Sequence, residues 1–172
     1  MTAPVQLTPD QWQQHPFVRY LAAEHLGTLK SCAMPVRFEA GQIIFREGDP
    51  ANRFYLVLDG AVALHTRGLE ETDTLIALLG GGDVLGWSWL FPPYQWHFDA
   101  TAQETTQAVF FYGTWLRQLA EEQHELGYEL MRRMAEVLMR RLQATRRQIL
   151  FPNEPGKPTG VESREHKRPA GD

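Results

Sequence analysis

The chain has 172 residues, a formal net charge of −4 and a single cysteine, Cys32. This length suits one domain with appendages, and a body of roughly 110–140 residues buries most of its apolar side chains without disulfides. The small net charge implies no bulk attraction to nucleic acid or membranes, and one cysteine excludes an internal disulfide framework and a four-cysteine metal site. With neither a signal peptide nor an apolar span of about 20 residues, we expect a cytoplasmic protein that does not cross a membrane.

The first predicted unit is a helical segment over residues 8–33. Thr8-Pro9 is a suitable helix start, because proline is tolerated in the first turn. Pro16 should interrupt the helix near Gln14. A second helical piece is expected from Phe17 to Ser31, and its buried side would carry Leu21, Leu26 and Leu29.

From residue 34 to residue 112 the hydrophobic period changes to two, which indicates strands. Asp59-Gly60 lies between two such runs and predicts a β-hairpin, because both residues suit the positive φ of a type I′ turn. Many short strands at close spacing are typical of a jelly roll or barrel. The strands are expected over residues 36–39, 42–45, 54–58, 61–65, 74–79, 83–85, 98–102 and 106–112.

After the strands, residues 114–150 read as helical. Thr114 can cap a short helix, and a longer helix is expected from His124 to about Ile149. Its apolar face is wider than packing on one small barrel requires, so we expect a homodimer. The predicted dimer interface is Leu126, Leu130, Met131, Met134, Val137, Leu138 and Leu142. Residues 151–172, rich in proline and charge, are expected to be a disordered tail.

The stretch from Gly86 to Ala102 is unusual in composition. It holds three of the five tryptophans and two adjacent prolines, and it contains no basic residue. A short aromatic segment between two strands is either a binding element or a local hydrophobic plug.

Three glycine-containing motifs and an Ala-Thr pair together suggest a family. Residues 38–49 read Phe-x-x-Gly-x-x-Ile-Phe-x-x-Gly-Asp, residues 54–62 read Phe-Tyr-Leu-Val-Leu-Asp-Gly-x-Val, residues 82–86 read Gly-Asp-x-x-Gly, and Ala100-Thr101 follows. Over about residues 14–148 this order resembles the cyclic-nucleotide-binding domain of catabolite activator proteins and kinase regulatory subunits. The resemblance implies a mainly β fold: an eight-stranded jelly roll with N-terminal helices, a long C-terminal helix, and a phosphate-binding cassette between the sixth and seventh strands.

In that family a Glu directly after the cassette glycine holds the ribose, and an Arg two residues before the Ala-Thr pair holds the cyclic phosphate. Trp87 and Phe98 occupy these two positions here. Each charge-assisted hydrogen bond is worth about 1.5–3 kcal/mol, so losing both would weaken binding by about two to four powers of ten. Asp99 would repel a phosphate if it pointed inward. An arginine from elsewhere could substitute, and the candidates are Arg117, Arg132 and Arg133.

Four interpretations of the cassette stay open at this point. It could bind an apolar or flat ligand through Trp87, Trp89, Tyr94 and Trp96, with Ser88, His97 and Asp99 as polar groups. It could instead hold another protein through its tryptophans and tyrosine, fill its own pocket with the tryptophans, or bind cyclic AMP or GMP with rearranged contacts. The candidate ligand-binding residues are Gly86, Trp87, Ser88, Trp89, Trp96, Phe98, Asp99, Ala100 and Thr101.

Catalysis and metal binding find little support. The sequence has no nucleophile elbow, phosphate loop or paired histidine spacing. Haem needs only one axial ligand, for which His97 and Cys32 are the candidates. The chain after Leu150 is too short for the winged helix-turn-helix of transcription-factor relatives, so no sequence-specific DNA binding is expected. We therefore predict a stand-alone, non-enzymatic regulatory or sensor domain that binds a small molecule or a partner protein and signals through its C-terminal helix.

Overall fold

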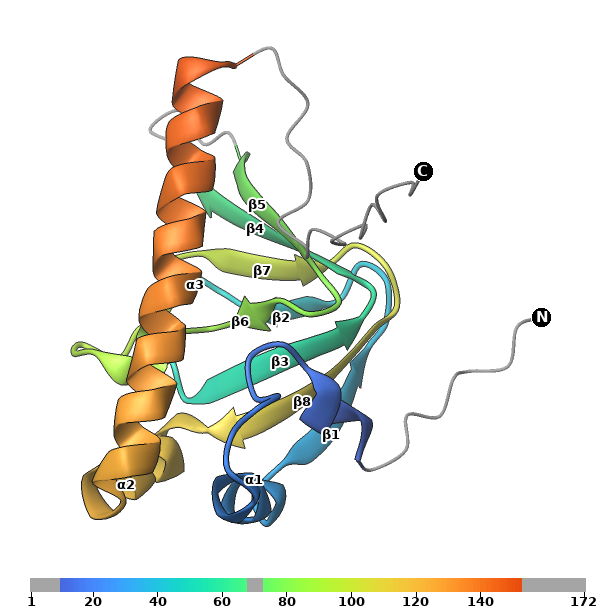
Figure 1. The fold of residues 1–172 in the computed structure, drawn as a ribbon. Coiled ribbons are helices and arrows are strands. Elements are labelled where there is room, and N and C mark those ends of the chain that lie inside the picture. The colour runs from blue at the N-terminus through green and yellow to red at the C-terminus, as the bar shows by residue number, and fades with distance from the viewer. Residues whose placement is uncertain (1–9, 68–72, 153–172) are drawn as a thin grey trace, which may run out of the picture.

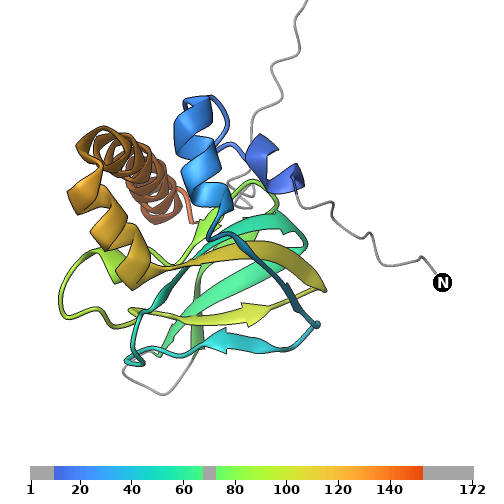
Figure 2. The ribbon, with the colours of Figure 1, turned by 90° about the horizontal axis from the view of Figure 1, so that it is seen from below.

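The computed structural model describes residues 10–67 and 73–152. Within these ranges, eight strands form two antiparallel four-stranded sheets that enclose an apolar interior, and the helices cover one of the sheets (Figure 1). Figure 2 shows the helices gathered on one side of the strands. The eight-stranded jelly roll with a long C-terminal helix is thus confirmed.

Each sheet mixes strands that are distant in sequence. The first sheet has the order β1-β8-β3-β6, and the second has the order β2-β7-β4-β5. The bounds in the first sheet are β1 Met34–Phe38, β8 Thr106–Tyr112, β3 Arg53–Asp59 and β6 Val84–Leu85. The bounds in the second sheet are β2 Ile43–Phe45, β7 Asp99–Ala102, β4 Ala61–Arg67 and β5 Asp73–Gly80.

The hairpin expected at Asp59-Gly60 is wrong. β3 pairs with β6 and β8, whereas β4 pairs with β5 and β7, so the dipeptide carries the chain from one sheet to the other. Gly60 does adopt a φ of 98°, and a Cβ there would lie 2.6 Å from the carbonyl oxygen of Thr105. The dipeptide therefore identified a sharp turn, but a turn signal does not say which strands pair beyond it.

Besides the short helix η2 (Ser88–Leu90) in the loop from β6 to β7, four helices flank the strands in the described ranges. Their bounds are η1 Gln11–Gln14, α1 Ala23–Lys30, α2 Gly113–Glu122 and α3 His124–Leu150. The helix expected from Phe17 to Ser31 begins only at Ala23, because turns occupy residues 16–20 and Tyr20 has a φ of 68°. Thr114 does not cap α2, whose N-cap residue is Tyr112. No helix in the described ranges is long and apolar enough to cross a membrane. The tail prediction from residue 153 onward lies outside the described residues.

Alternation along β3 separates two cores. Tyr55 and Val57 point into the barrel interior, whereas Phe54 and Leu56 point toward the helices. The interior core collects residues from both sheets, and the helix-side core joins the first sheet to α1, α2 and α3. A residue of the cassette can therefore enter either core, with different consequences.

Candidate functional site: the aromatic cassette and its anchors

The cassette links β6 to β7 and contains the short helix η2, Ser88–Leu90. Its two most buried tryptophans point to opposite sides. Trp96 belongs to the barrel interior, and Trp89 belongs to the helix-side core. The candidate residues chosen from sequence therefore do not line a single pocket.

Trp96 fills the barrel beneath the cassette. Its side chain is 4% exposed and stacks on Phe45, with ring centroids 3.8 Å apart and 9° between the planes. Its backbone is held on both sides, since its N–H donates to the Asp49 carbonyl at 2.9 Å and its carbonyl accepts from the Gly48 N–H at 2.8 Å. The indole thus occupies the interior as a core side chain, which corresponds to the plug interpretation.

Gly86 is shaped to this indole. Its φ is 85°, and a Cβ at this position would lie 2.8 Å from the Cζ3 and Cη2 atoms of Trp96. Real Cβ atoms do not approach so closely, so any side chain here would displace the ring. The cassette glycine of the motif is therefore in direct contact with Trp96.

The remaining candidate residues, on and next to β7, make hydrogen bonds, core contacts or strand pairs within the fold. Asp99 Oδ1 accepts a hydrogen bond from the Glu47 backbone N–H at 2.7 Å. Phe98 packs against the interior core, and Ala100 is fully buried in it. Thr101 is half-buried and pairs with Ile43 and Ala63 across the second sheet.

The outward side of the cassette carries an aromatic surface. Trp87 is half-buried and stacks on His97 with centroids 5.3 Å apart, while Ser88 Oγ lies 2.9 Å from His97 Nδ1. Phe91 and Tyr94 are exposed on the same loop. We call Trp87, Phe91, Tyr94 and His97 the outer aromatic patch. Phe91, Tyr94 and His97 are exposed, whereas Trp87 also packs against the helix-side core.

Arg117 of α2 reaches this loop. Its guanidinium donates to the Trp89 carbonyl and lies over the Tyr94 ring, 4.1 Å from the centroid. The other two substitute candidates point elsewhere. Arg132 pairs with Glu129 and Glu136 on α3 itself. Arg133 donates to the backbone carbonyls of Phe17 and Arg19. Of the three candidate arginines, only Arg117 contacts the cassette, and it holds the loop from its outer side.

A buried histidine, missed from sequence, ties the N-terminal segment to the residue that precedes β6. His15 Nδ1 accepts from the Phe17 backbone N–H at 3.1 Å. Its Nε2 must then carry the proton and donates to the Asp83 carbonyl at 3.1 Å. Burial lowers the pKa of His15 to about 4. The ring is therefore neutral at pH 7 and acts as a structural bridge.

Arg141 forms a matching bridge from α3. Its guanidinium is partly buried and donates to the Val84 carbonyl, two residues before Gly86. Burial lowers the pKa of the Arg141 guanidinium and raises the pKa of the nearby Asp83 carboxyl. The signal for Arg141 was its spacing, since it continues the buried stripe of Leu130, Met134 and Val137.

The predicted dimer interface divides between two faces of α3. Leu126, Leu130, Met134 and Val137 are buried within the chain, in the helix-side core. Met131 and Leu142 are exposed, and Leu138 is half-buried. These three, with Ile149, follow a spacing of seven, four and seven residues, which is a heptad seam.

The structure adds no support for haem or metal binding by the residues that it describes. His97 is engaged with Ser88 and Trp87, and Cys32 is a partly exposed free thiol beside Ser31. Within residues 10–67 and 73–152, no three His, Cys, Asp or Glu side chains cluster as metal ligands would.

Two of the known proteins that this chain resembles in sequence have names that refer to cyclic AMP. The CRP-like cAMP-activated global transcriptional regulator of Mycobacterium tuberculosis is 28% identical over 135 residues, which covers 77% of this chain and 58% of the relative. The cyclic AMP receptor protein of Thermus thermophilus is 30% identical over 125 residues, covering 70% of this chain and 58% of the relative. The chain thus spans less than two thirds of the length of these two regulators.

Among solved structures, a proposed cyclic nucleotide-binding protein from Geobacter metallireducens GS-15 aligns with a TM-score of 0.71 and 26% identity, covering 79% of this chain and 98% of that chain. The Thermus thermophilus catabolite activator protein aligns with a TM-score of 0.64 and 25% identity, covering 80% of this chain and 62% of that chain. The sequence model of the cyclic nucleotide-binding domain matches residues 35–123, more than half of the chain. This chain therefore belongs to the cyclic nucleotide-binding domain family.

Proposed function

We propose that this chain is a regulatory domain that works without a cyclic nucleotide and acts on a protein partner through its cassette. One observation carries the proposal: Trp96 is stacked on Phe45 inside the barrel and contacts Gly86, the cassette glycine. An indole in this place competes with any nucleotide that would enter beneath the cassette. The positions of the ribose and phosphate contacts, Trp87 and Phe98, offer no charge to compensate.

The outer aromatic patch is the surface left for recognition. Trp and Tyr are favoured anchors in protein interfaces because they bury a large area with few rotatable bonds. Phe91 is 47% exposed and Tyr94 is 37% exposed. Arg117 holds the loop in place, which lowers the entropy lost when a partner binds. A protein partner therefore suits the patch better than a small ligand would. The related M. tuberculosis and T. thermophilus proteins bear the names of regulators, and we propose no catalytic activity for this chain.

Signalling would pass through α3. Arg141 joins α3 to Val84 just before the cassette, and Arg117 joins α2 to the cassette loop. The outward seam of Met131, Leu138, Leu142 and Ile149 suits a homodimer. Partner binding would change signalling only if the partner binds one arrangement of α3 more tightly than the other.

Thermal unfolding with millimolar cyclic AMP and cyclic GMP tests the proposal. A ligand at 100 times its dissociation constant adds about 2.7 kcal/mol of stability. We expect no shift with either nucleotide for the wild-type protein. A saturable shift would overturn the proposal and favour the alternative, a cyclic nucleotide sensor with rearranged phosphate contacts. The variant Phe98→Arg, which restores the cassette arginine, is the matched control for a weak residual site.

A further inference from the structure

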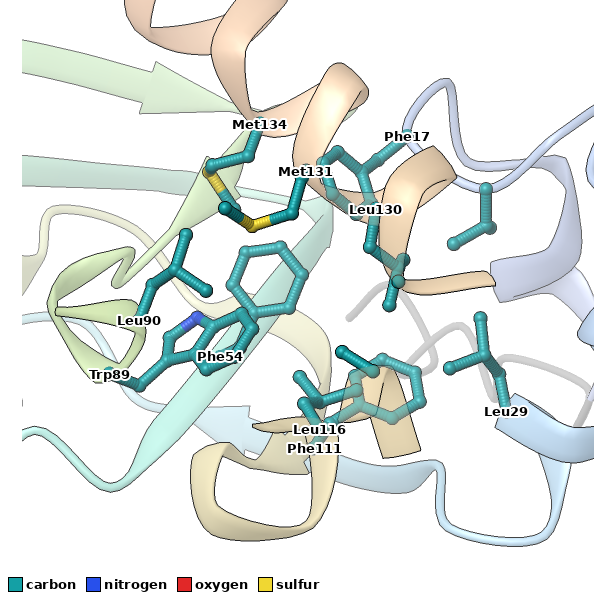
Figure 3. Close-up of a pocket in the computed structure, with 13 residues that line it drawn as sticks. Phe17, Leu29, Phe54, Trp89, Leu90, Phe111, Leu116, Leu130, Met131 and Met134 are labelled. Atoms are coloured by element: carbon teal, nitrogen blue, oxygen red, sulfur yellow. The ribbon is translucent and has the colours of Figure 1, made fainter. Parts of the chain in front are cut away.

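α3 borders two spaces of very different size. On the side of the first sheet, Figure 3 shows Leu130 and Met134 packed with Phe54 and Trp89, and the space left among these side chains is about 20 Å³. Between α3 and residues 16–25, by contrast, lies a groove of about 620 Å³. Ligand pockets measure about 300–1,000 Å³, so the groove has room for a partner where the sheet side has none.

The groove carries one unpaired charge at each end. The ion pairs along its α3 wall join Glu129, Arg132, Arg133 and Glu136. Glu125 and Arg140 line the groove on either side of this set, and their side chains have no ion-pair or hydrogen-bond partner among the described residues. They are 15 residues apart in the helix. At 1.5 Å per residue the separation is about 22 Å, so the groove is negative at one end and positive at the other.

Two polar side chains on the opposite wall also lack a partner. Arg19 contacts an aromatic ring but has no carboxylate partner in the described part of the chain. Its carbonyl accepts from Arg133 at 3.1 Å, which places Arg19 near the middle of the groove. His25 is 9% exposed, lines the groove, and makes no hydrogen bond through its ring within the described ranges. Since buried polar groups are normally paired, His25 calls for a polar partner in the groove.

An extended peptide suits this groove better than a small ion does. A peptide brings a backbone N–H and C=O at nearly every residue, and either group can pair with His25. About seven residues at 3.3 Å each cover the length between Glu125 and Arg140. The matching peptide has an acidic residue at the Arg140 end, another acidic residue near the middle for Arg19, and a basic residue at the Glu125 end.

The chain itself contains this order of charges after α3. Glu162, Glu165 and Arg168 follow one another at intervals of three residues. In an extended chain with three residues per turn these three side chains share one face, and Arg164 and Lys167 fall on the others. Glu162 would then meet the positive end of the groove, Glu165 its middle and Arg168 its negative end.

The connection from α3 allows this placement. α3 ends at Leu150, about 15 Å along the helix axis beyond Arg140. The described residues end at Pro152, and the ten residues from there to Glu162 span up to about 33 Å. The chain can therefore turn back at the end of α3. Exposed ion pairs are individually weak, but a short tether gives the segment an effective concentration of about millimolar.

We propose that residues 162–168 dock in the groove of their own chain, antiparallel to α3. The docked segment fastens residues 16–25 to the helix through ion pairs at both ends and in the middle. Its release leaves α3 with one contact fewer to the N-terminal segment. The inference does not depend on the partner proposed for the cassette.

Paramagnetic relaxation from a spin label on the segment tests the docking. A nitroxide is attached at Ser163→Cys in the full chain, with the free thiol removed by Cys32→Ser. We expect loss of amide signal intensity in residues 19–25 and 132–140, relative to the reduced label. Reversing the three charges with Glu162→Lys, Glu165→Lys and Arg168→Glu should restore the signals. Salt at 1 M should also restore them, because it shortens the screening length to about 3 Å.

Two controls make the result specific. Arg140→Glu should restore the signals, whereas Arg146→Glu should not, because Arg146 is on α3 but does not line the groove. A mixture of ¹⁵N-labelled chain without nitroxide and unlabelled chain with nitroxide reports docking into a second copy. No loss of intensity in the first experiment, a loss that survives charge reversal, or an equal loss in the mixture would each overturn the proposal.

Discussion

Trp96 and Phe45 stack face to face inside the barrel, with 3.8 Å between their ring centroids, and they join the cassette to β2. The pair makes a regulatory cassette into part of a hydrophobic core. A ligand-binding loop normally needs its own conformational freedom, and here its central side chain is committed to packing. This relationship leads to the first two predictions.

Removing the Trp96 indole should destabilise the domain strongly. Trp96→Ala leaves a cavity in the interior core, and such substitutions cost about 3–5 kcal/mol of the free energy of unfolding. Phe91→Ala on the same loop is the control, because this exposed side chain should change stability by no more than about 0.5 kcal/mol. Urea unfolding followed by circular dichroism measures both. Equal effects of the two substitutions would show that Trp96 is not part of the core.

Gly86→Ala should be more harmful than Gly41→Ala. Both glycines have left-handed backbone, with φ values of 85° and 84°, and this strain costs an alanine about 1–2 kcal/mol. A Cβ on Gly86 also meets Trp96 at 2.8 Å, whereas a Cβ on Gly41 meets no atom within 4 Å. Overpacking adds about 1–3 kcal/mol for Gly86 alone. Chemical denaturation of the two variants gives the difference, and matched stabilities would contradict the contact with Trp96.

The free energy of unfolding should decrease as the pH is lowered, because His15 is buried in its neutral form. Burial lowers its pKa from about 6.5 to about 4, so the unfolded chain binds the proton more readily. This contribution is complete above pH 6.5 and is lost as pH falls toward 4, by about 3 kcal/mol in total. The raised pKa of Asp83 acts in the opposite direction over the acidic range. His15→Gln cannot titrate, so its unfolding free energy should vary less between pH 7 and pH 4. Parallel pH profiles for both proteins would rule out this role.

Arg141 should hold the C-terminal half of α3. Arg141→Ala leaves the Val84 carbonyl without its charged donor and is expected to cost about 1–3 kcal/mol. Amide hydrogen exchange should rise in residues 138–150 and around Val84, while β3 and β8 stay protected. Arg132→Ala is the matched control, because its ion pairs with Glu129 and Glu136 are exposed and worth at most about 1 kcal/mol. A uniform rise in exchange across the domain would argue against a local anchor.

Leu142→Glu should prevent self-association without unfolding the chain. Leu142 is 70% exposed in the single chain, so a charge there meets solvent in the monomer but is desolvated in a coiled-coil seam. Sedimentation should show a dimer for the wild type and a monomer for the variant. Gln143→Glu, one position along the helix, is the control for added charge and should remain dimeric. A wild-type monomer would contradict the seam.

Sequence determined the strand positions and the family, and both rest on local chemistry. The eight expected strands each overlap an observed strand, because alternation of apolar residues follows directly from the two-residue period of a strand. Glycine turns and the Ala100-Thr101 pair established the family for the same reason. The absence of the cassette glutamate and arginine could also be seen in the sequence, because it depends only on the identity of the residues at positions 87 and 98.

Only the tertiary structure decided where each side chain points. Sequence placed Trp89 and Trp96 in one candidate pocket, yet they enter different cores, because the turn closed by the Tyr94 N–H and the Phe91 carbonyl lies between them. It also placed Leu126 and Leu142 on one interface, although the first packs on the barrel and the second faces solvent. Sequence could not assign the partners of His15 and Arg141, because the carbonyls of Asp83 and Val84 are distant in sequence. Backbone carbonyls exist at every position, and only folding selects the ones that a side chain can reach.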